Sequence, residues 1–165
     1  MGVSRLHVLL LAVLSIGCHS ESRSIVEEPE MLRVLSVNSL EYEIAFELDE
    51  LTQYAEGLYM AVLKLDSLAT ANVVSAVERN PVIAGDSLFS QIHWHRTPAS
   101  GLRDGTFAYS PVTSATQEQI DSLASSLATS GNLFCYYERV SNPGDFSVYL
   151  IDKQQNRIVI FHLYS

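Results

Sequence analysis

Residues 133–164 read LFCYYERV, SNPGD, FSVYLIDK, QQN and RIVIFHLY, and they predict three consecutive β-strands joined by two turns. The runs 133–140, 146–153 and 157–164 are rich in β-branched and aromatic residues, which favour strands. The segments between them carry Asn, Pro, Gly, Asp and Gln, and the first of them is a typical turn cluster. The last run is apolar on both faces, which indicates a central strand covered on both sides. We therefore expect a C-terminal β-meander.

A helix is predicted immediately before this meander. Ser114 and Gln117 have the spacing of a capping box, and Gly131 suits a helix C-terminus. Between them runs one apolar stripe at helical spacing: Ile120, Leu123, Ala124 and Leu127.

The segment 41–48 alternates apolar and mostly acidic residues with a period of two, which favours an amphipathic strand with an acidic outer face. A helix is the alternative, because Leu40, Ile44 and Leu48 also share one helical face. Residues 31–37 predict a further short strand. Residues 88–96 predict another.

A long helix is predicted from Asp49 to Arg79, with Asn80-Pro81 as its end. Asp66-Ser67 offers a second cap that would split it into two helices. Its apolar residues recur at intervals of four and three: Leu51, Ala55, Leu58, Val62, Leu65 and Ala69. This spacing also occurs in coiled-coil dimers, but the flanking positions lack the charges that set partner choice. We therefore expect the helix to pack on the sheet of the same chain.

Together these segments predict an α+β fold. It comprises a twisted antiparallel sheet with the C-terminal β-meander and two or three helices packed on one face, in a single domain over residues 31–165. Residues 97–111 predict a loop with a short extended piece at 106–109.

Composition supports a globular domain and excludes one class of partner. Of 165 residues, 47% are apolar and 18% are charged, which is typical of a folded chain. Ten basic residues against nineteen acidic ones give a net charge of −9. Nucleic acid is therefore not an expected partner, because phosphate binding needs a basic surface.

The N-terminus has the pattern of a secretory signal peptide, predicted at residues 1–17. Arg5 supplies a positive charge, and an apolar run follows from Val8 to Leu14. This run is shorter than the ~20 apolar residues that span a bilayer. Residues 19–30 are polar and acidic, and a flexible segment of this length spans ~20 Å.

Leu14-Ser15-Ile16-Gly17-Cys18 resembles the lipobox of bacterial lipoproteins. The resemblance implies cleavage before Cys18, lipid attached to Cys18, a polar tether at residues 18–30, and membrane contact through the lipid anchor. With His19 after the cysteine, it implies an outer-membrane lipoprotein that faces the periplasm. Ser15 departs from the family, which has Leu at that position. Ser15 and Gly17 also fit ordinary signal peptidase, so a secreted or periplasmic soluble protein is the alternative.

Cys18 and Cys135 are the two cysteines of the chain. If Cys18 carries lipid, we expect Cys135 to be a buried and inert thiol among aromatic neighbours. If Cys18 is free, the two cysteines could form a disulfide in an exported protein.

His93 and His95 are the candidate metal ligands. Residues two apart on a strand point to the same side, so both imidazoles should share a face with Phe89 and Gln91. Such a pair could bind zinc or copper if a third ligand joined it, and zinc sites need at least three protein ligands. The candidates for that ligand are His162, Asp86, Asp104 and Glu138. The simpler interpretation places both histidines on a solvated face and His162 in a half-buried core position.

No catalytic motif for an activated serine, a phosphate loop or a zinc helix occurs in the sequence. Aromatic residues gather on the predicted meander, where they form either core or a ligand-stacking platform: Tyr136, Tyr137, Tyr149, Phe161 and Tyr164. The sequence thus predicts a membrane-tethered envelope lipoprotein with a non-enzymatic binding or assembly role, whose partner is another envelope protein. The alternative is a secreted metal-binding protein or metal-dependent enzyme that uses His93 and His95.

Overall fold

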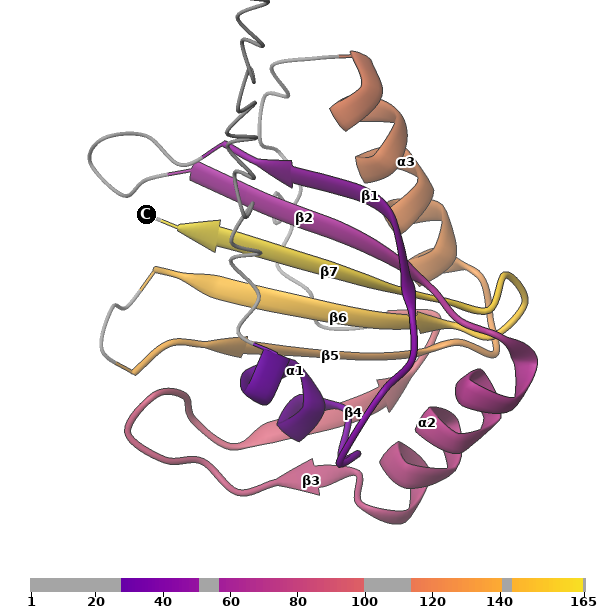
Figure 1. The fold of residues 1–165 in the computed structure, drawn as a ribbon. Helices are drawn as coiled ribbons and strands as arrows, with labels where there is room; N and C mark the ends of the chain where they lie inside the picture. Colours follow the sequence, from indigo (N-terminus) through magenta and orange to yellow (C-terminus); the bar gives the residue numbers. More distant parts are fainter. Residues whose placement is uncertain (1–27, 51–56, 100–113, 141–143, 165) are drawn as a thin grey trace, which may run out of the picture.

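The computed structural model describes residues 28–50, 57–99, 114–140 and 144–164. Its elements in chain order are α1 (Glu28–Val34), β1 (Glu43–Asp49), β2 (Gly57–Lys64), α2 (Ser67–Arg79), β3 (Val82–Ile83), β4 (Ile92–Arg96), α3 (Ser114–Ala128), β5 (Leu133–Glu138), β6 (Phe146–Asp152) and β7 (Arg157–Tyr164). The strands form one antiparallel sheet in the order β1-β2-β7-β6-β5-β4-β3 (Figure 1). The fold is therefore mixed α+β and consists mostly of sheet.

The predicted β-meander is confirmed. Strand β5 pairs with β6, and β6 pairs with β7. Strand β7 lies inside the sheet between β2 and β6. Its residues Ile158 and Ile160 pack into one core while Val159 and Phe161 pack into another, each at most 1% exposed. A central strand covered on both faces was the expectation for this apolar run.

The helices lie on both faces of the sheet, so the prediction that they share one face was wrong. Val34 of α1 and Val73 of α2 belong to the first core, whereas Leu123 of α3 belongs to the second. In Figure 1, α1 and α2 lie in front of the sheet and α3 lies behind it. The reason is that β2, β6 and β7 are apolar on both sides, and each side needs a cover.

Two N-terminal predictions were also wrong. The strand predicted at residues 31–37 is absent there, because residues 31–34 belong to helix α1, and Met31 and Val34 bury one face of this helix at helical spacing. Residues 57–64 form strand β2, which is buried from Gly57 to Leu63, instead of the first half of a long helix. A fully apolar strand shows no period of two, so its spacing matched a helical pattern by coincidence.

The second half of that predicted helix is confirmed as α2. Asp66 caps its start, and the carboxylate oxygen accepts a hydrogen bond from the backbone amide of Ala69 at 2.6 Å. Asn80 is its C-terminal cap, as the Asn80-Pro81 pair predicts. Helix α3 also matches its prediction, and Gly131 follows it with a left-handed φ of 100°.

The strand predicted at 88–96 is divided. Residues 92–96 form β4, whereas Phe89 makes an isolated bridge with Arg139. The predicted loop begins after β4, but its extended piece at 106–109 lies outside the described residues.

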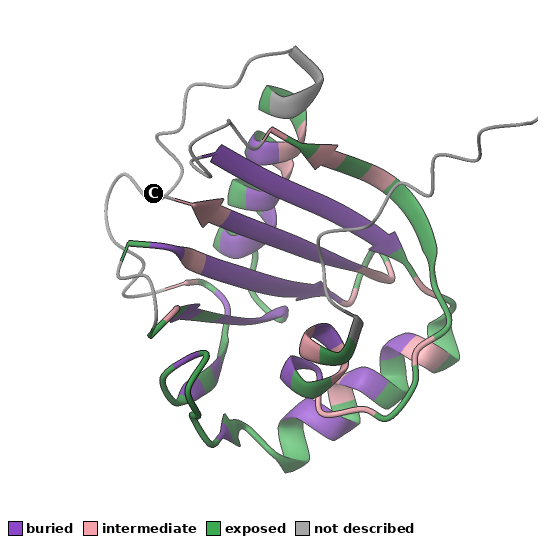
Figure 2. Cartoon of the chain, turned by 60° about the vertical axis from the view of Figure 1, so that its left-hand side comes forward, coloured by how far each residue is buried: buried purple, intermediate pink, exposed green. Residues whose placement is uncertain are grey.

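Strand β1 confirms the prediction for residues 41–48 and forms one edge of the sheet. Its pairing with β2 shifts between Ile44 and Phe46, which marks a β-bulge. Phe46 and Leu48 pack against the α3 core, while Glu43 and Glu47 are exposed (Figure 2). The bulge and the carboxylates are typical protection of an edge strand.

Candidate functional site

The histidines of the predicted pair lie side by side on β4. His93 and His95 are exposed, whereas Ile92 and Trp94, which alternate with them along the strand, are buried. The indole nitrogen of Trp94 donates a hydrogen bond to the backbone carbonyl of Val34 in α1, at 3.1 Å. Because successive side chains of a strand alternate between its two faces, both imidazoles lie on the opposite face, which is the face that α3 covers further along the sheet.

The sequence placed Phe89 and Gln91 on the same face as the histidines, and this was right for Gln91 alone. Phe89 is 1% exposed and belongs to the core on the other side. The strand is irregular between Phe89 and Ile92, because Phe89 makes only an isolated bridge, and this irregularity breaks the alternation.

Strand β5 adds an aromatic ring to the histidine pair. Tyr136 is the direct partner of His93 across the two strands, and it is 40% exposed. The ring centroids of His93 and His95 lie 6.4 Å apart at 26°, and those of His95 and Tyr136 lie 6.4 Å apart at 23°. The ring of His95 also contacts the buried ring of Phe134 at 5.4 Å. The ring plane of His95 thus lies within 26° of the planes of both His93 and Tyr136.

These rings border a shallow depression of about 360 Å³. Gln91 and Glu138 contribute an amide and a carboxylate to its lining. The Nε2 atom of His93 and the Oε1 atom of Gln91 are hydrogen-bonded at 3.1 Å. We refer to Gln91, His93, His95, Tyr136 and Glu138 together as the β4–β5 shelf.

The candidates for a third metal ligand are distributed over different parts of the molecule. Glu138 borders the same depression as the two histidines. His162 belongs to the opposite face of the sheet, where it is hydrogen-bonded to Ser147. Asp86 forms an ion pair with Arg33. Asp104 lies outside the described residues, and among the described ones no three His, Cys, Asp or Glu side chains form a group that could hold a metal ion.

His162 is a core residue, more deeply buried than the sequence suggested. It is 3% exposed, and its Nδ1 atom lies 2.5 Å from the hydroxyl of Ser147. Its ring stacks on Tyr59 with centroids 5.7 Å apart and meets Tyr149 edge-on at 5.8 Å. Burial lowers the pKa of His162 to about 3, and the positive charge of Arg139 acts in the same direction. The imidazole is therefore neutral at physiological pH.

A second polar group, which is partly buried, links α1 to β5 on this face. The carboxylate of Glu30 accepts a hydrogen bond from the hydroxyl of Tyr137 at 2.6 Å and pairs with Arg139 at 3.2 Å. The hydroxyl of Tyr149 is buried and makes no hydrogen bond of normal geometry with the described residues. Burial raises the pKa of both tyrosines, which stay protonated. Nothing in the sequence pattern linked Glu30 to residues more than a hundred positions away.

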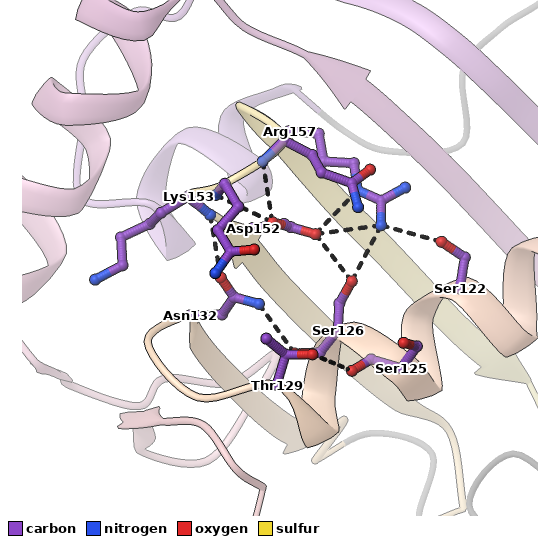
Figure 3. A network of polar contacts seen from close by, with 10 residues as sticks. Ser122, Ser125, Ser126, Thr129, Asn132, Asp152, Lys153 and Arg157 are labelled. Atoms are coloured by element: carbon purple, nitrogen blue, oxygen red, sulfur yellow. Dashed lines mark hydrogen bonds and ion pairs between the residues drawn. The ribbon is translucent and has the colours of Figure 1, made fainter.

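A polar network fastens the β6–β7 turn to the C-terminal half of α3 (Figure 3). Arg157 donates from Nη2 to the hydroxyls of Ser122 and Ser126, both at 3.0 Å, and to Asp152 at 3.2 Å. Ser126 donates to the carboxylate of Asp152 at 2.9 Å. Asn132 joins this network through the backbone carbonyl of Ser126, at 3.0 Å. These polar groups are hydrogen-bonded to one another, so we interpret the network as stabilising the fold.

The two cysteines differ in what the structure shows of them. Cys135 is a fully buried free thiol in β5, as expected, and burial raises its pKa. A protonated and inaccessible thiol is a poor nucleophile. Cys18 and the leader lie outside the described residues. Within the described part of the chain, no helix is both long and apolar enough to cross a membrane.

Sequence reasoning named the members of the β4–β5 shelf but did not assemble them. Tyr136 was counted among the meander aromatics and Glu138 among the metal ligands, and the pairing of β4 with β5 is what brings them to one surface. Of the predicted aromatic platform, Tyr137, Tyr149 and Phe161 are core residues. The period of two along a strand places Tyr136 and Tyr137 on opposite faces of β5, and this signal is available from the sequence. The strand that pairs with β5 cannot be deduced from it.

Comparison with known proteins leaves the site to be interpreted from its own chemistry. No protein-family model matches this sequence, and neither a curated protein nor a solved structure matches it at a significant level.

Proposed function

We propose that this chain is a lipid-tethered protein of the bacterial cell envelope whose folded part has a non-enzymatic binding role. One observation carries the proposal: Cys18 stands directly between an apolar leader and a polar segment, ahead of the first helix at Glu28. A leader of this length is typical of export. A cysteine directly after such a leader is the residue to which bacterial lipoproteins attach their lipid.

The distance between Cys18 and α1 suits a short tether. Nine residues separate them, and a flexible chain of that length spans about 17 Å. Helix α1 is well fixed to the sheet, since Glu30 pairs with Arg139, Trp94 bonds the carbonyl of Val34, and the guanidinium of Arg33 lies 4.5 Å from the centre of the Phe89 ring. An anchor attached before α1 would therefore hold the whole sheet.

The charge of the chain favours attachment through lipid alone. Removing residues 1–17 removes Arg5 and no acidic residue, which leaves nine basic against nineteen acidic residues and a net charge of −10. Such a surface is repelled by anionic lipid headgroups. The protein face would then stay free to bind a partner. By the resemblance of the leader, with His19 after Cys18, we place the protein at the outer membrane facing the periplasm.

Metabolic labelling with a palmitate analogue tests the anchor. The chain with its leader should incorporate the label and fractionate with membranes. Cys18→Ala should lose both properties, whereas Cys135→Ala should keep them, because Cys135 is buried in β5. Soluble, unlabelled protein from the unmodified chain would show that the leader serves plain secretion.

A second candidate function is metal binding by His93 and His95, favoured by their adjacent and nearly parallel rings. Neutral imidazoles are good ligands for zinc and copper, and Glu138 borders the same depression. Elemental analysis of the purified protein should then find one metal ion per chain, and His93→Ala should abolish it. A metal content far below one per chain would exclude this candidate.

A further inference from the structure

We propose that the β4–β5 shelf binds a neutral glycan, an inference that rests on the proposed binding role and names its ligand class. The shelf combines exposed aromatic rings with hydrogen-bonding groups at their border. A sugar ring has the complementary chemistry, with an apolar face of C–H groups and hydroxyls around its edge.

The rings form a platform on a part of the sheet that none of the described helices covers. The ring planes of Tyr136 and His95 lie at 23° to each other, and the exposed ring of His93 continues the row on β4. Val82 on β3 pairs with His93 and is 40% exposed, so the row extends across three strands. Neighbouring strands are about 4.8 Å apart, which makes the row roughly 10 Å long between the backbones of its ends. This length accommodates a disaccharide lying across the strands.

The border of the platform supplies groups for hydroxyls. The amide of Gln91 and the imidazole nitrogens can both donate and accept hydrogen bonds, and the carboxylate of Glu138 accepts them. Because Gln91 is already bonded to His93, the two side chains hold each other in position. A polyhydroxylated ligand can use all of these groups without a change of protonation.

The charge of the shelf selects against other ligand classes. Among the described residues that line the depression there is one carboxylate, Glu138, and no lysine or arginine. Phosphate and other anionic ligands need cationic partners, so the shelf disfavours anionic polymers. The depression is also open and has a mixed polar and apolar lining, whereas sites for apolar small molecules are enclosed and lined mainly by apolar side chains.

The test is binding of the full chain to a panel of neutral oligosaccharides. Cellotetraose, chitotetraose, maltotetraose and mannotetraose are titrated up to millimolar concentration, with and without EDTA, while amide and aromatic NMR signals are recorded. At least one oligosaccharide should bind without a metal requirement and shift signals of residues 91–95 and 136–138. Tyr136→Ala should weaken this binding about tenfold, equal to about 1.4 kcal/mol.

Tyr42→Ala is the matched control, because Tyr42 is similarly exposed (37%) and precedes β1 at the opposite edge of the sheet. It should leave the affinity unchanged. Equal loss in both variants, binding abolished by EDTA, or no binding of any oligosaccharide would each overturn the proposal. The palmitate labelling is independent of these outcomes, so a failure here is distinguishable from failure of the lipid anchor.

Discussion

Replacing Asp152 by Asn should destabilise the protein strongly, because this carboxylate is the acceptor at the centre of the α3 network. One oxygen accepts from Ser126 and twice from Arg157, at 2.9–3.3 Å. The other accepts from the backbone amides of Gln154 and Gln155, at 3.2 and 3.1 Å. The side chains of Asp152 and Arg157 are only 4% and 11% exposed.

The magnitude follows from what the substitution leaves behind. An asparagine has nearly the same shape and keeps one carbonyl oxygen, so either the turn amides or the guanidinium lose their acceptor. If the oxygen stays with Gln154 and Gln155, an NH2 group faces the donors of Arg157 and leaves its charge buried without a counter-ion. Breaking a buried pair from one side costs about 3–5 kcal/mol. We expect a loss within that range.

The assay is urea unfolding followed by circular dichroism, with the free energy of unfolding extrapolated to zero denaturant. Asp121→Asn is the control, since Asp121 accepts an exposed hydrogen bond from Gln117 on the same helix. It should change the stability by less than about 0.5 kcal/mol. A loss below about 1 kcal/mol for Asp152→Asn, with an unchanged slope, would refute the account of this network as a buried ion pair.

Three further predictions follow from single positions. Burial lowers the pKa of His162 to about 3 from an unfolded value of 6.5, so the unfolded chain binds more protons than the folded chain between these pH values. The free energy of unfolding should therefore be constant above pH 7 and fall by about 1.4 kcal/mol per pH unit below pH 6. In urea titrations at several pH values, His162→Gln should flatten this dependence. Asp66→Ala removes the cap of α2 and should lower the free energy of unfolding by about 1 kcal/mol in the same assay, whereas Ser75→Ala on the exposed side of α2 should not. Gly85→Ala would place a Cβ atom 2.8–2.9 Å from the backbone of residues 89–91. It should therefore lower the free energy of unfolding by about 1–3 kcal/mol and shift the NMR signals of Gln91. An unchanged melting temperature would contradict the close approach.

How well each segment of the fold could be predicted from the sequence depended on its place in the sheet. The turns and β-rich runs of residues 133–164 specify a local meander, and no distant contact is needed to recognise it. The caps Asp66 and Gly131 are equally local, and both predictions were confirmed. By contrast, β2 is buried on both faces, and an all-apolar run does not distinguish a strand from a buried helix.

The candidate site was less predictable, because it depends on which strands become neighbours. His93 and His95 were recognised as a pair from their spacing alone. Tyr136 joins them only because β4 pairs with β5 in the register that sets His93 opposite Tyr136. Helix α3 lies between these strands in the sequence, so no hairpin turn indicates that they pair. Periodicity gives the face of a strand, but it does not give its neighbour.

The placement of the helices explains why a binding surface exists at this position. On the side of α3, the second core is built from β2, β5, β6 and β7, and its β5 member is Phe134. His95 contacts Phe134 at the border of that core, and beyond it β4 and β3 carry exposed side chains on this side. Helix α1 lies on the opposite side of the sheet. We propose that a lipid anchor joined to the domain through α1 leaves the β4–β5 shelf uncovered, so that the protein can hold a membrane and a glycan at once. Loss of glycan binding when the protein is attached to vesicles through Cys18 would contradict this arrangement.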